Sequence, residues 1–268
     1  MGSKTLISGT GYDIKGGKTL ISGTGYAIKQ GKTLINGIAK TIDLDKPITS
    51  VNSGETVPVA ENGSPVDYIV VQIGTPNTDY YQNADGYWLL RKNLDSTMHG
   101  YYNCLHNNRD DFDYDYADYR TATKENDIQT NEQKFYNRYG PNLKSIIMTP
   151  TLPFEQGSNS IQLTVKNVFH LGVVEVRASS SGSNQTVLSY FKNAKLAYGY
   201  GYGDGPEPLR IAYHDGIAGR WHTRDAMSGT VGAAMSISAY GNWEQYVGGY
   251  YRPCIIVPKT ITLGDLLS

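Results

Sequence analysis

The sequence contains little cysteine and no long apolar run. Its 268 residues include only two cysteines, Cys104 and Cys254, which are too few for a disulfide framework and lack the spacing of a metal site. We expect both to be buried free thiols, although the sequence leaves open whether they pair. No stretch approaches the roughly 20 apolar residues of a transmembrane helix, so a membrane is not an expected partner.

The N-terminus also lacks an apolar signal segment. Met1 is followed by Gly-Ser-Lys and then directly by repeats, whereas a secretory signal has a charged start and an apolar stretch. We therefore expect synthesis in the cytoplasm, without export by a standard signal.

The sequence has no excess of charge of one sign. Lys and Arg number 24 against 25 Asp and Glu, which gives a net charge of −1. Because nucleic-acid binding depends on an excess of positive charge, no nucleic-acid partner is expected. The hydrophobic fraction of 39% and the charged fraction of 18% are typical of a folded protein, and the length suits one large or two small domains.

Phe and Trp are scarce, whereas Tyr and Gly are abundant. The chain has 5 Phe and 3 Trp but 22 Tyr and 30 Gly. Binding loops use Tyr for rigid contact area and Gly, Ser and Asn for adaptability. A fold of many short strands and turns needs Gly and Tyr as well, so the composition alone leaves both interpretations open.

Residues 4–40 contain three copies of a 14-residue repeat. The copies begin at Lys4, Lys18 and Lys32 with Lys-Thr-Leu-Ile-(Ser/Asn)-Gly, and the first two continue as Thr-Gly-Tyr-x-Ile-Lys. Thr-Leu-Ile and Tyr-x-Ile-Lys are short β-prone runs, and the Ser-Gly-Thr-Gly, Gly-Gly and Gln-Gly stretches between them are typical of tight turns. Each copy therefore predicts two strands and two turns.

Three such copies contain too few apolar side chains to form a core of their own. Repeats of this size bury their apolar face by stacking on neighbouring repeats or on other chains. We expect residues 1–40 to form a homo-oligomeric β-stem, with a trimer favoured, or a strand-adding arm; the alternative is a disordered Gly-rich tail. The side chains expected at this contact are the apolar residues of the repeats: Leu6, Ile7, Tyr12, Ile14, Leu20, Ile21, Tyr26, Ile28, Leu34 and Ile35.

Residues 41–65 mix Pro, Gly, Ser and Asn with few apolar residues and predict a linker. Residues 66–268 have the pattern of a globular domain. Its expected strands are β-prone runs bounded by turn residues, at residues 67–74, 86–93, 143–150, 160–165, 168–177, 233–240 and 251–258.

One helix is expected in this domain. Thr130 and Gln133 fit a capping box, Ile128, Phe135 and Tyr139 fall on one helical face, and Gly140-Pro141 ends the run. A single main helix among many strands predicts an α+β fold that is mostly antiparallel.

Five motifs occur in one order along the domain: YWLLRKN at residues 87–93, FYNRY at 135–139, VFHLGVVEV at 168–176, RWHTRD at 220–225 and GYYRPCIIVP at 249–258. This order resembles a family of uncharacterised domains that is abundant in phages and prophages of Gram-positive bacteria. The N-terminal repeat likewise resembles repeats of phage structural proteins. RWHTRD replaces the Leu-Arg-Ser that is usual in the family, and Cys254 stands where a small apolar residue is common.

The family is similar to the C-type-lectin-like fold, and the resemblance implies roles for several residues. Trp88 and Trp221 would be buried, while Arg91, Arg224 and Arg252 would bind carbonyls or carboxylates and fix long loops to the sheet. Recognition would fall to the loops of residues 195–221. The side chains expected to bind a ligand there are rings and polar groups: Tyr198, Tyr200, Tyr202, Asp204, Glu207, His214 and Asp215.

Other chemistries find weaker support in the sequence. The alternating glycines of residues 199–205 are followed by Pro206 and Pro208 and lack the Gly-Lys-Ser/Thr of a nucleotide loop. Glu207-Pro208 is similar to the calcium and sugar motif of animal lectins, but Leu209 stands where an oxygen ligand is needed.

A second calcium pattern and a hydrolase site are also incomplete. Asp111, Asp113 and Asp115 have alternate spacing but lack the Gly and Glu that complete a calcium loop. Five histidines are present, including His170 in an apolar run, where a core role is expected, yet no Gly-x-Ser-x-Gly elbow accompanies them. We therefore expect no enzymatic activity, no cofactor and no metal.

The resemblance implies a virion protein made in the host cytoplasm, in which the repeats anchor an oligomeric fibre or appendage. Its expected partners are other virion proteins and further copies of itself. The outward domain would bind a glycan or protein of the bacterial surface. In the alternative, the protein decorates or assembles the capsid, neck or tail and contacts only other virion subunits.

Overall fold

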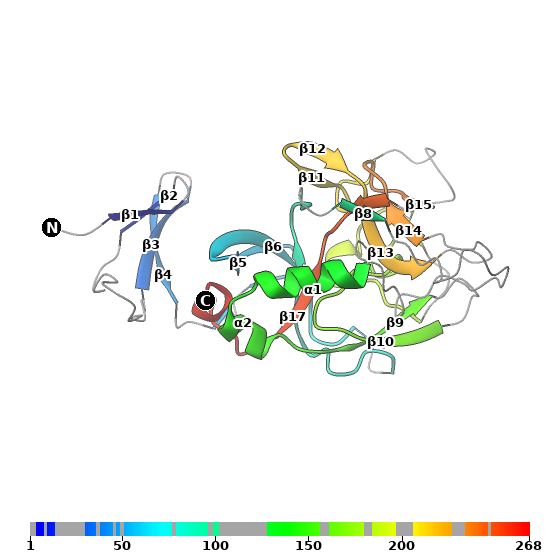
Figure 1. Ribbon diagram of the computed structural model, residues 1–268, viewed down its shortest axis with the longest axis horizontal. Helices are drawn as coiled ribbons and strands as arrows, with labels where there is room; N and C mark the ends of the chain where they lie inside the picture. The colour runs from blue at the N-terminus through cyan, green and yellow to red at the C-terminus, as the bar shows by residue number, and fades with distance from the viewer. Residues whose placement is uncertain are drawn as a thin grey trace.

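The computed structural model describes residues 4–7, 10–13, 30–35, 38–44, 47–48, 51–76, 79–95, 99–101, 128–155, 161–179, 184–196, 206–226, 234–245 and 248–268. These residues form five sheets and three short α-helices, arranged as shown in Figure 1. The chain is therefore α+β, and its strands pair mostly in antiparallel fashion, as the sequence predicts.

The N-terminal repeats form an antiparallel sheet of four strands (Figure 1). In order across the sheet these are β1 Lys4–Ile7, β2 Thr10–Asp13, β3 Gln30–Ile35 and β4 Ile38–Asp43. Ile7 lies opposite Thr10 and Ile35 opposite Ile38, so two residues connect each hairpin. These residues are Ser-Gly and Asn-Gly, which suit a connection of this length.

The turn expected over Ser-Gly-Thr-Gly is therefore too long. Thr10 and Gly11 lie in β2, because a two-residue connection already reverses the chain. The third copy also continues as β4 to Asp43, beyond the expected end at residue 40. Five of the expected contact residues lie in these strands: Leu6, Ile7, Tyr12, Leu34 and Ile35. The other five lie outside the described residues: Ile14, Leu20, Ile21, Tyr26 and Ile28.

A second antiparallel sheet forms the centre of the C-terminal domain. In order across the sheet its strands are β5 Thr56–Glu61, β6 Ser64–Ile73, β7 Gly86–Arg91 and β17 Cys254–Pro258. The last strand pairs with β7 over its whole length, from Cys254 opposite Leu90 to Pro258 opposite Gly86. The last strand of the chain thereby forms one edge of the sheet, and β5 forms the other.

Strand β5 lies within the segment that was expected to be a linker. Val57 and Val59 alternate along β5 and are buried, and the Asn62-Gly63 turn, with positive φ at both residues, connects β5 to β6. Ile48 is also buried in the core. The globular unit therefore begins before Val66, because a few alternating apolar residues suffice to place an edge strand on an existing core.

Both faces of the central sheet are covered by apolar side chains. Tyr87 and Leu89 point into one core, together with Phe135, and Trp88 and Leu90 point into the other. Side chains alternate across a strand, so a continuous apolar run such as Tyr-Trp-Leu-Leu predicts burial on both sides. The helices supply the first core and the loops after residue 168 supply much of the second.

The helices are α1 Ile128–Arg138, α2 Pro141–Ile146 and α3 Leu263–Leu266. The expected main helix is present as α1, with Phe135 buried. Because α1 begins at Ile128, Thr130 lies inside the helix and is not its N-cap. The strand expected at residues 143–150 is wrong, because Pro141 occupies the first turn of α2 and Leu143 is buried on its inner face.

A third sheet lies against the second core and contains five short strands. In order across the sheet they are β15 Trp243–Gln245, β14 Ala234–Ile237, β13 Trp221–Ala226, β16 Gly248–Tyr250 and β8 His99–Tyr101. β13 and β16 run parallel, and the other pairs are antiparallel. Two further hairpins complete the domain: β9 Thr151–Glu155 with β10 Ile161–Val165, and β11 Ala212–His214 with β12 Ile217–Gly219.

The strand expected at residues 168–177 is not formed. This segment runs as coil and turns, and one bridge pairs Phe169 with Cys254. Its backbone N–H groups at Gly172 and Val173 donate to the carboxylates of Glu175 and Asp225. Side-chain acceptors therefore take the place that a strand partner would have occupied.

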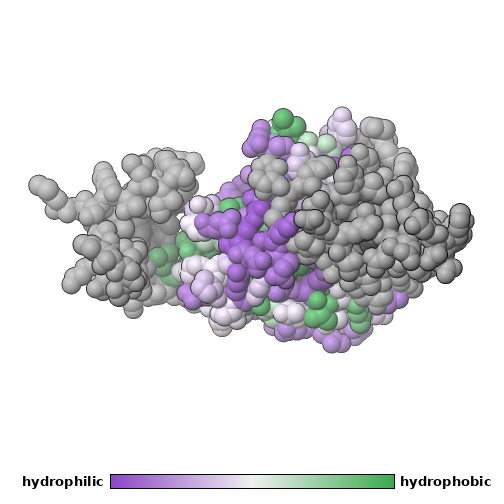
Figure 2. Space-filling view, in the orientation of Figure 1, coloured by the Kyte–Doolittle hydropathy of each residue, from purple (hydrophilic) through white to green (hydrophobic). Residues whose placement is uncertain are grey.

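None of the helices that the structure describes is long and apolar enough to span a membrane. The outward surface over α1 is mostly hydrophilic (Figure 2), in line with the many polar residues of that helix.

Candidate functional site

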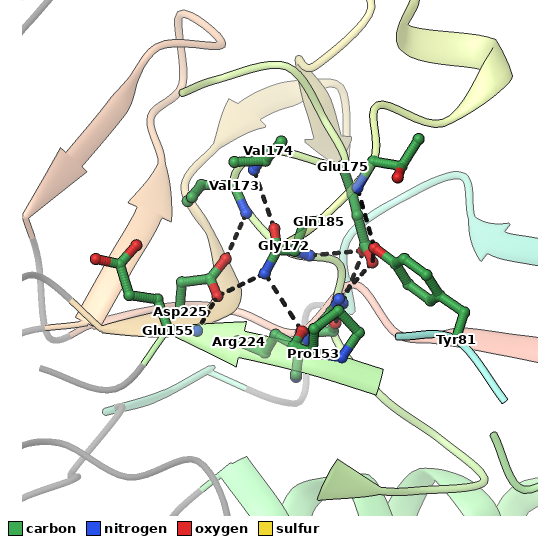
Figure 3. Close-up of polar contacts among 12 residues, drawn as sticks. Tyr81, Pro153, Glu155, Gly172, Val173, Val174, Glu175, Gln185, Arg224 and Asp225 are labelled. Carbon is green, nitrogen blue, oxygen red and sulfur yellow. Dashed lines mark hydrogen bonds and ion pairs between the residues drawn. The ribbon is translucent and has the colours of Figure 1, made fainter. Parts of the chain in front are cut away.

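Arg224 and Glu175 form an ion pair at the centre of the domain, and both side chains are fully buried. The Arg224 Nη1 donates to Glu175 Oε2 at 2.7 Å and to the His170 carbonyl at 2.9 Å, and Nε donates to the Pro153 carbonyl at 2.8 Å. The Tyr81 hydroxyl donates to Glu175 Oε1 at 2.7 Å. Figure 3 shows this network, in which β13, β9 and the 170–175 segment meet.

The neighbouring Asp225 carboxylate binds the other side of the same segments (Figure 3). It accepts hydrogen bonds from the backbone N–H of Glu155 at 2.8 Å and of Val173 at 2.7 Å, and from Gln185 Nε2 at 2.7 Å. Burial raises the pKa of Asp225, while these donors and Arg224 favour its charged form. Arg224 and Asp225 together fix two long loop segments to β13.

Glu155 has an altered acidity. Glu155 is buried. Burial, as the larger cause, and the nearby Asp225 carboxylate, as the smaller cause, raise the pKa of Glu155 to about 7. The Glu155 side chain extends away from the network in Figure 3. This carboxyl therefore changes its charge near neutral pH. The backbone N–H of Glu155 donates to Asp225, so Glu155 is part of the same network.

A second polar cluster, which we term the neck, joins the two ends of the Tyr-Gly segment of residues 197–205. The buried Glu207 carboxylate accepts from the backbone N–H of Lys195 at 2.7 Å and of Leu209 at 3.1 Å. Arg210 is fully buried and donates to the Lys195 carbonyl at 2.7 Å and to the Arg177 carbonyl at 3.0 Å. The residues just before and just after the Tyr-Gly segment are thereby held together.

The neck also binds the turn of residues 238–242. The Glu207 N–H donates to the Tyr240 carbonyl at 2.8 Å, and Arg210 Nε donates to the Gly241 carbonyl. Ser238 closes the turn by accepting from the N–H of Tyr240 and of Asn242. Tyr240 itself is 57% exposed, so a large aromatic side chain faces solvent from a turn that is fixed at both ends.

The β11–β12 hairpin carries two of the expected site residues. Asp215 and Gly216 both have positive φ and form its two-residue turn. His214 Nδ1 lies 3.1 Å from Asp215 Oδ2, and its ring packs on Tyr250 with centroids 4.7 Å apart. Ile217 is 66% exposed, and Figure 2 shows hydrophobic surface over this hairpin at the top of the view.

The expected ligand-binding residues are thus only partly brought together. Tyr198, Tyr200, Tyr202 and Asp204 lie outside the described residues. Glu207 binds backbone groups of the neck, which is a structural role, whereas His214 and Asp215 lie on the separate β11–β12 hairpin.

The expected structural residues are confirmed. Trp88 and Trp221 are fully buried. Arg91 binds Glu61 and the Asn93 carbonyl, and Arg252 binds the Arg91 carbonyl at 3.0 Å. Cys254 is buried as a thiol, and burial raises its pKa, whereas Cys104 lies outside the described residues.

Among the residues of these networks that were not singled out from the sequence are Glu175, Asp225 and Arg210. Glu175 carried one usable signal, because a carboxylate inside the apolar run Val-Val-Glu-Val predicts a buried partner. Nothing in the local sequence marks Arg210 as the residue that closes the neck.

The described part of the chain contains no group of three or more His, Cys, Asp or Glu side chains arranged to hold a metal ion. The acidic residues Asp111, Asp113 and Asp115 lie outside it.

Comparison with known proteins gives one match. No curated protein and no solved structure matches the chain. A family model described as a domain of unknown function, DUF6273, matches residues 80–259. This range runs from Tyr80, before β7, to Lys259, after β17, and it includes both polar networks. Since the match covers well over half of the sequence, the chain belongs to the DUF6273 family.

Proposed function

We propose that this protein is a phage virion structural protein whose N-terminal repeats anchor it and whose C-terminal domain binds a glycan or protein of the host cell surface. The five motifs and the repeat support the virion assignment by their resemblance to phage proteins. The domain is further proposed to be C-type-lectin-like. The pairing of β7 with the last strand β17 supports this, since it leaves long segments between them that can serve as loops.

The observation that carries the binding proposal is the neck. Glu207 and Arg210 join Lys195 to the residues after the Tyr-Gly segment. A segment whose ends are fixed loses less conformational entropy on binding than a free one. The neck therefore favours residues 197–205 as a presented binding loop, with Tyr240 as an exposed ring at its base.

Tyr198, Tyr200 and Tyr202 supply the chemistry that a glycan or protein ligand requires. Tyr rings offer apolar faces for sugar rings or side chains, and their hydroxyls offer hydrogen bonds. One such loop binds weakly. An oligomer held together by the β1–β4 repeats, with a trimer favoured, would present several loops at once, and linked sites gain avidity by about 10²- to 10⁴-fold.

The test of binding is replacement of Tyr200 and Tyr202 by Ala in the full chain on the assembled particle. We expect attachment to host cells to be lost while the protein is still incorporated. The matched control is Tyr213→Ala, which removes a 46% exposed ring from the β11–β12 hairpin, and it should attach normally. Unchanged attachment by the double variant would reject the binding role.

The second candidate function is decoration or assembly of the virion, at its capsid, at the virion neck or at its tail. It is favoured by β10, which pairs only with β9 among the described strands and exposes Leu163 at 46% and Val165 at 62%. Exposed apolar strand edges often bind other chains. In this case Leu163→Lys with Val165→Lys should prevent incorporation into particles, whereas the Tyr200 and Tyr202 replacements should have no effect on attachment.

The anchor is tested by deleting residues 1–40. We expect the shortened protein to fold, to become monomeric and to be missing from purified particles. A deletion variant that keeps the oligomeric state of the full chain would show that the repeats do not assemble it.

A further inference from the structure

Three aromatic rings meet inside the domain and connect three separate segments. His170, His222 and Tyr251 are all fully buried. The ring centroids of His170 and His222 are 6.3 Å apart, and Tyr251 lies 5.3 Å from His170 and 5.6 Å from His222. Two imidazoles therefore share a site without solvent exposure, next to the Glu175 network, whose Arg224 binds the His170 carbonyl.

The segments that carry these rings are joined by few backbone hydrogen bonds. Phe169 and Cys254 exchange one pair, at 3.1 and 2.7 Å, the Arg224 N–H donates to the Leu171 carbonyl at 3.2 Å, and the Tyr250 N–H donates to the Arg220 carbonyl at 2.9 Å. Gly249 lies against His222, since a Cβ built there would be 3.5 Å from the imidazole Nε2. The ring cluster thus lies where the 168–171 segment, β13 and the strand connection before β17 come together.

The cations of Arg224 and Lys166 act on the His170 imidazole, and each is paired with a carboxylate. Arg224 approaches from β13 and binds Glu175, and Lys166 approaches from the end of β10 and binds Glu132 of α1 at 2.8 Å. Tyr251 faces the pair from the 251–253 connection. Burial, followed by His222, Lys166 and Arg224, holds the pKa of His170 well below its usual range. A proton on the His170 ring would place a positive charge beside the His222 ring and near two cations.

We propose that His170 and His222 form an acid-sensitive latch: as neutral rings they hold the 168–171 segment, β13 and the connection before β17 together, and protonation opens this contact. The latch controls the packing of loop segments on the central sheet. It is independent of the identity of any ligand, because it rests on the cluster alone.

The expected change of the unfolding equilibrium with pH follows from the protonation of histidine in the unfolded chain. A histidine in an unfolded chain has a pKa near 6.5, so at pH 5.5 it is about ten times more protonated than neutral. Each imidazole that the fold keeps neutral therefore raises the unfolding equilibrium constant about 10-fold between pH 7.5 and pH 5.5. The stabilisation is complete above pH 7 and is lost as the pH falls below 6.5.

The test compares denaturant unfolding of the full wild-type chain with that of His170→Gln at pH 7.5 and pH 5.5. We expect the ratio of their unfolding equilibrium constants to change about 10-fold between the two pH values. The control, Ile217→Ala, truncates a 66% exposed, non-titrating side chain of the β11–β12 hairpin and should leave the pH dependence of the wild type unchanged. Equal pH dependence of wild type and His170→Gln would overturn the latch.

Two measurements on the wild-type protein keep the proposal testable if His170→Gln does not fold. Imidazole ring protons of His170 and His222 should not shift between pH 7.5 and 6.0 in the nuclear magnetic resonance spectrum. Below that range, amide protection should fall first at Phe169 and Cys254 and persist in β5 and β6. Ordinary titration of His170 and His222 near pH 6.5 in the folded protein would refute the proposal.

Discussion

Arg224 and Glu175, 49 residues apart, form a two-point ion pair with both side chains inaccessible to solvent. The guanidinium also binds two backbone carbonyls, and the carboxylate also binds the Tyr81 hydroxyl and the Gly172 N–H. A buried pair offsets its desolvation only when its remaining hydrogen-bonding groups are satisfied as well. The pair therefore acts as a fixed point around which the irregular 168–177 segment is arranged.

Replacing Glu175 by Gln should lower the free energy of unfolding by about 3 to 5 kcal/mol, because Arg224 would keep a buried charge without its counter-ion. Urea unfolding followed by circular dichroism measures this change. The control is Lys92→Gln, which breaks an ion pair with Asp67 whose side chains are 45% and 56% exposed and should cost less than about 1 kcal/mol. Similar losses for the two variants would contradict the central role of the buried pair.

Glu61 joins α1 to the central sheet, and Asp95 also accepts from Arg138 of α1. Its carboxylate accepts from Arg91 Nε at 2.9 Å, from Arg138 Nη1 of α1 at 3.4 Å and from the Tyr68 hydroxyl at 2.8 Å. Glu61→Gln should destabilise the fold by about 2 kcal/mol, because charge-assisted hydrogen bonds to both arginines are weakened. Hydrogen exchange should show faster opening of α1 than of the β5–β6 hairpin, and uniform protection across both elements would argue against this role.

Glu155 should make stability fall as the pH rises. Its folded pKa of about 7 lies above the usual 4.5, so the folded state binds more protons than the unfolded state between these values. The stabilising proton is present below pH 4.5 and is lost as the pH rises through 7. We expect Glu155→Gln to exceed the wild type by about 1 to 2 kcal/mol at pH 8 and to match it at pH 4.5.

Thermal unfolding of both proteins across this pH range measures the difference. A constant gap between Glu155→Gln and the wild type, independent of pH, would show that the carboxyl does not take up its proton in the folded protein near neutral pH.

Replacing Gly241 by Ala disturbs the neck without changing any charge. It has a φ of +81°, and a Cβ there would lie 2.5 Å from the Glu207 carbonyl oxygen. Gly241→Ala should cost about 3 kcal/mol, from left-handed strain together with the displaced Glu207 backbone. Gly216 has nearly the same φ, +78°, with open space around it, so Gly216→Ala carries the strain alone and should cost about 1 kcal/mol. Equal losses in thermal unfolding would mean that the neck tolerates displacement.

The elements that sequence patterns predicted correctly are those defined by their own residues. Strands β6, β7 and β17 are apolar runs long enough to be buried on both faces, and α1 carries Phe135 at a helical position. The burial of Trp88 and Trp221 follows in the same way, since a large apolar ring gains free energy by leaving water wherever the chain places it.

The elements that sequence patterns missed depend on partners far along the chain. β5 is an edge strand because β6 offers it a hydrogen-bonding edge, although its own residues mix with turn formers. The sequence of residues 168–177 predicts a strand. In the structure, Glu175 and Asp225 accept hydrogen bonds from its backbone and hold the segment in turns. Glu207 was expected to face a ligand, and it instead holds the backbone of Lys195.

The sequence by itself therefore determined the repeat, the α+β class and the apolar strands, because periodicity and side-chain volume act over a few neighbouring residues. Only the tertiary structure decided which charged residues are structural. Arg224 forms an ion pair with Glu175, Arg210 donates to the Lys195 carbonyl, and the His170 ring lies beside the His222 ring. The physical reason is that the free energy of a charged or titratable group depends on burial and on groups brought near it by folding, and neither is written in its local sequence.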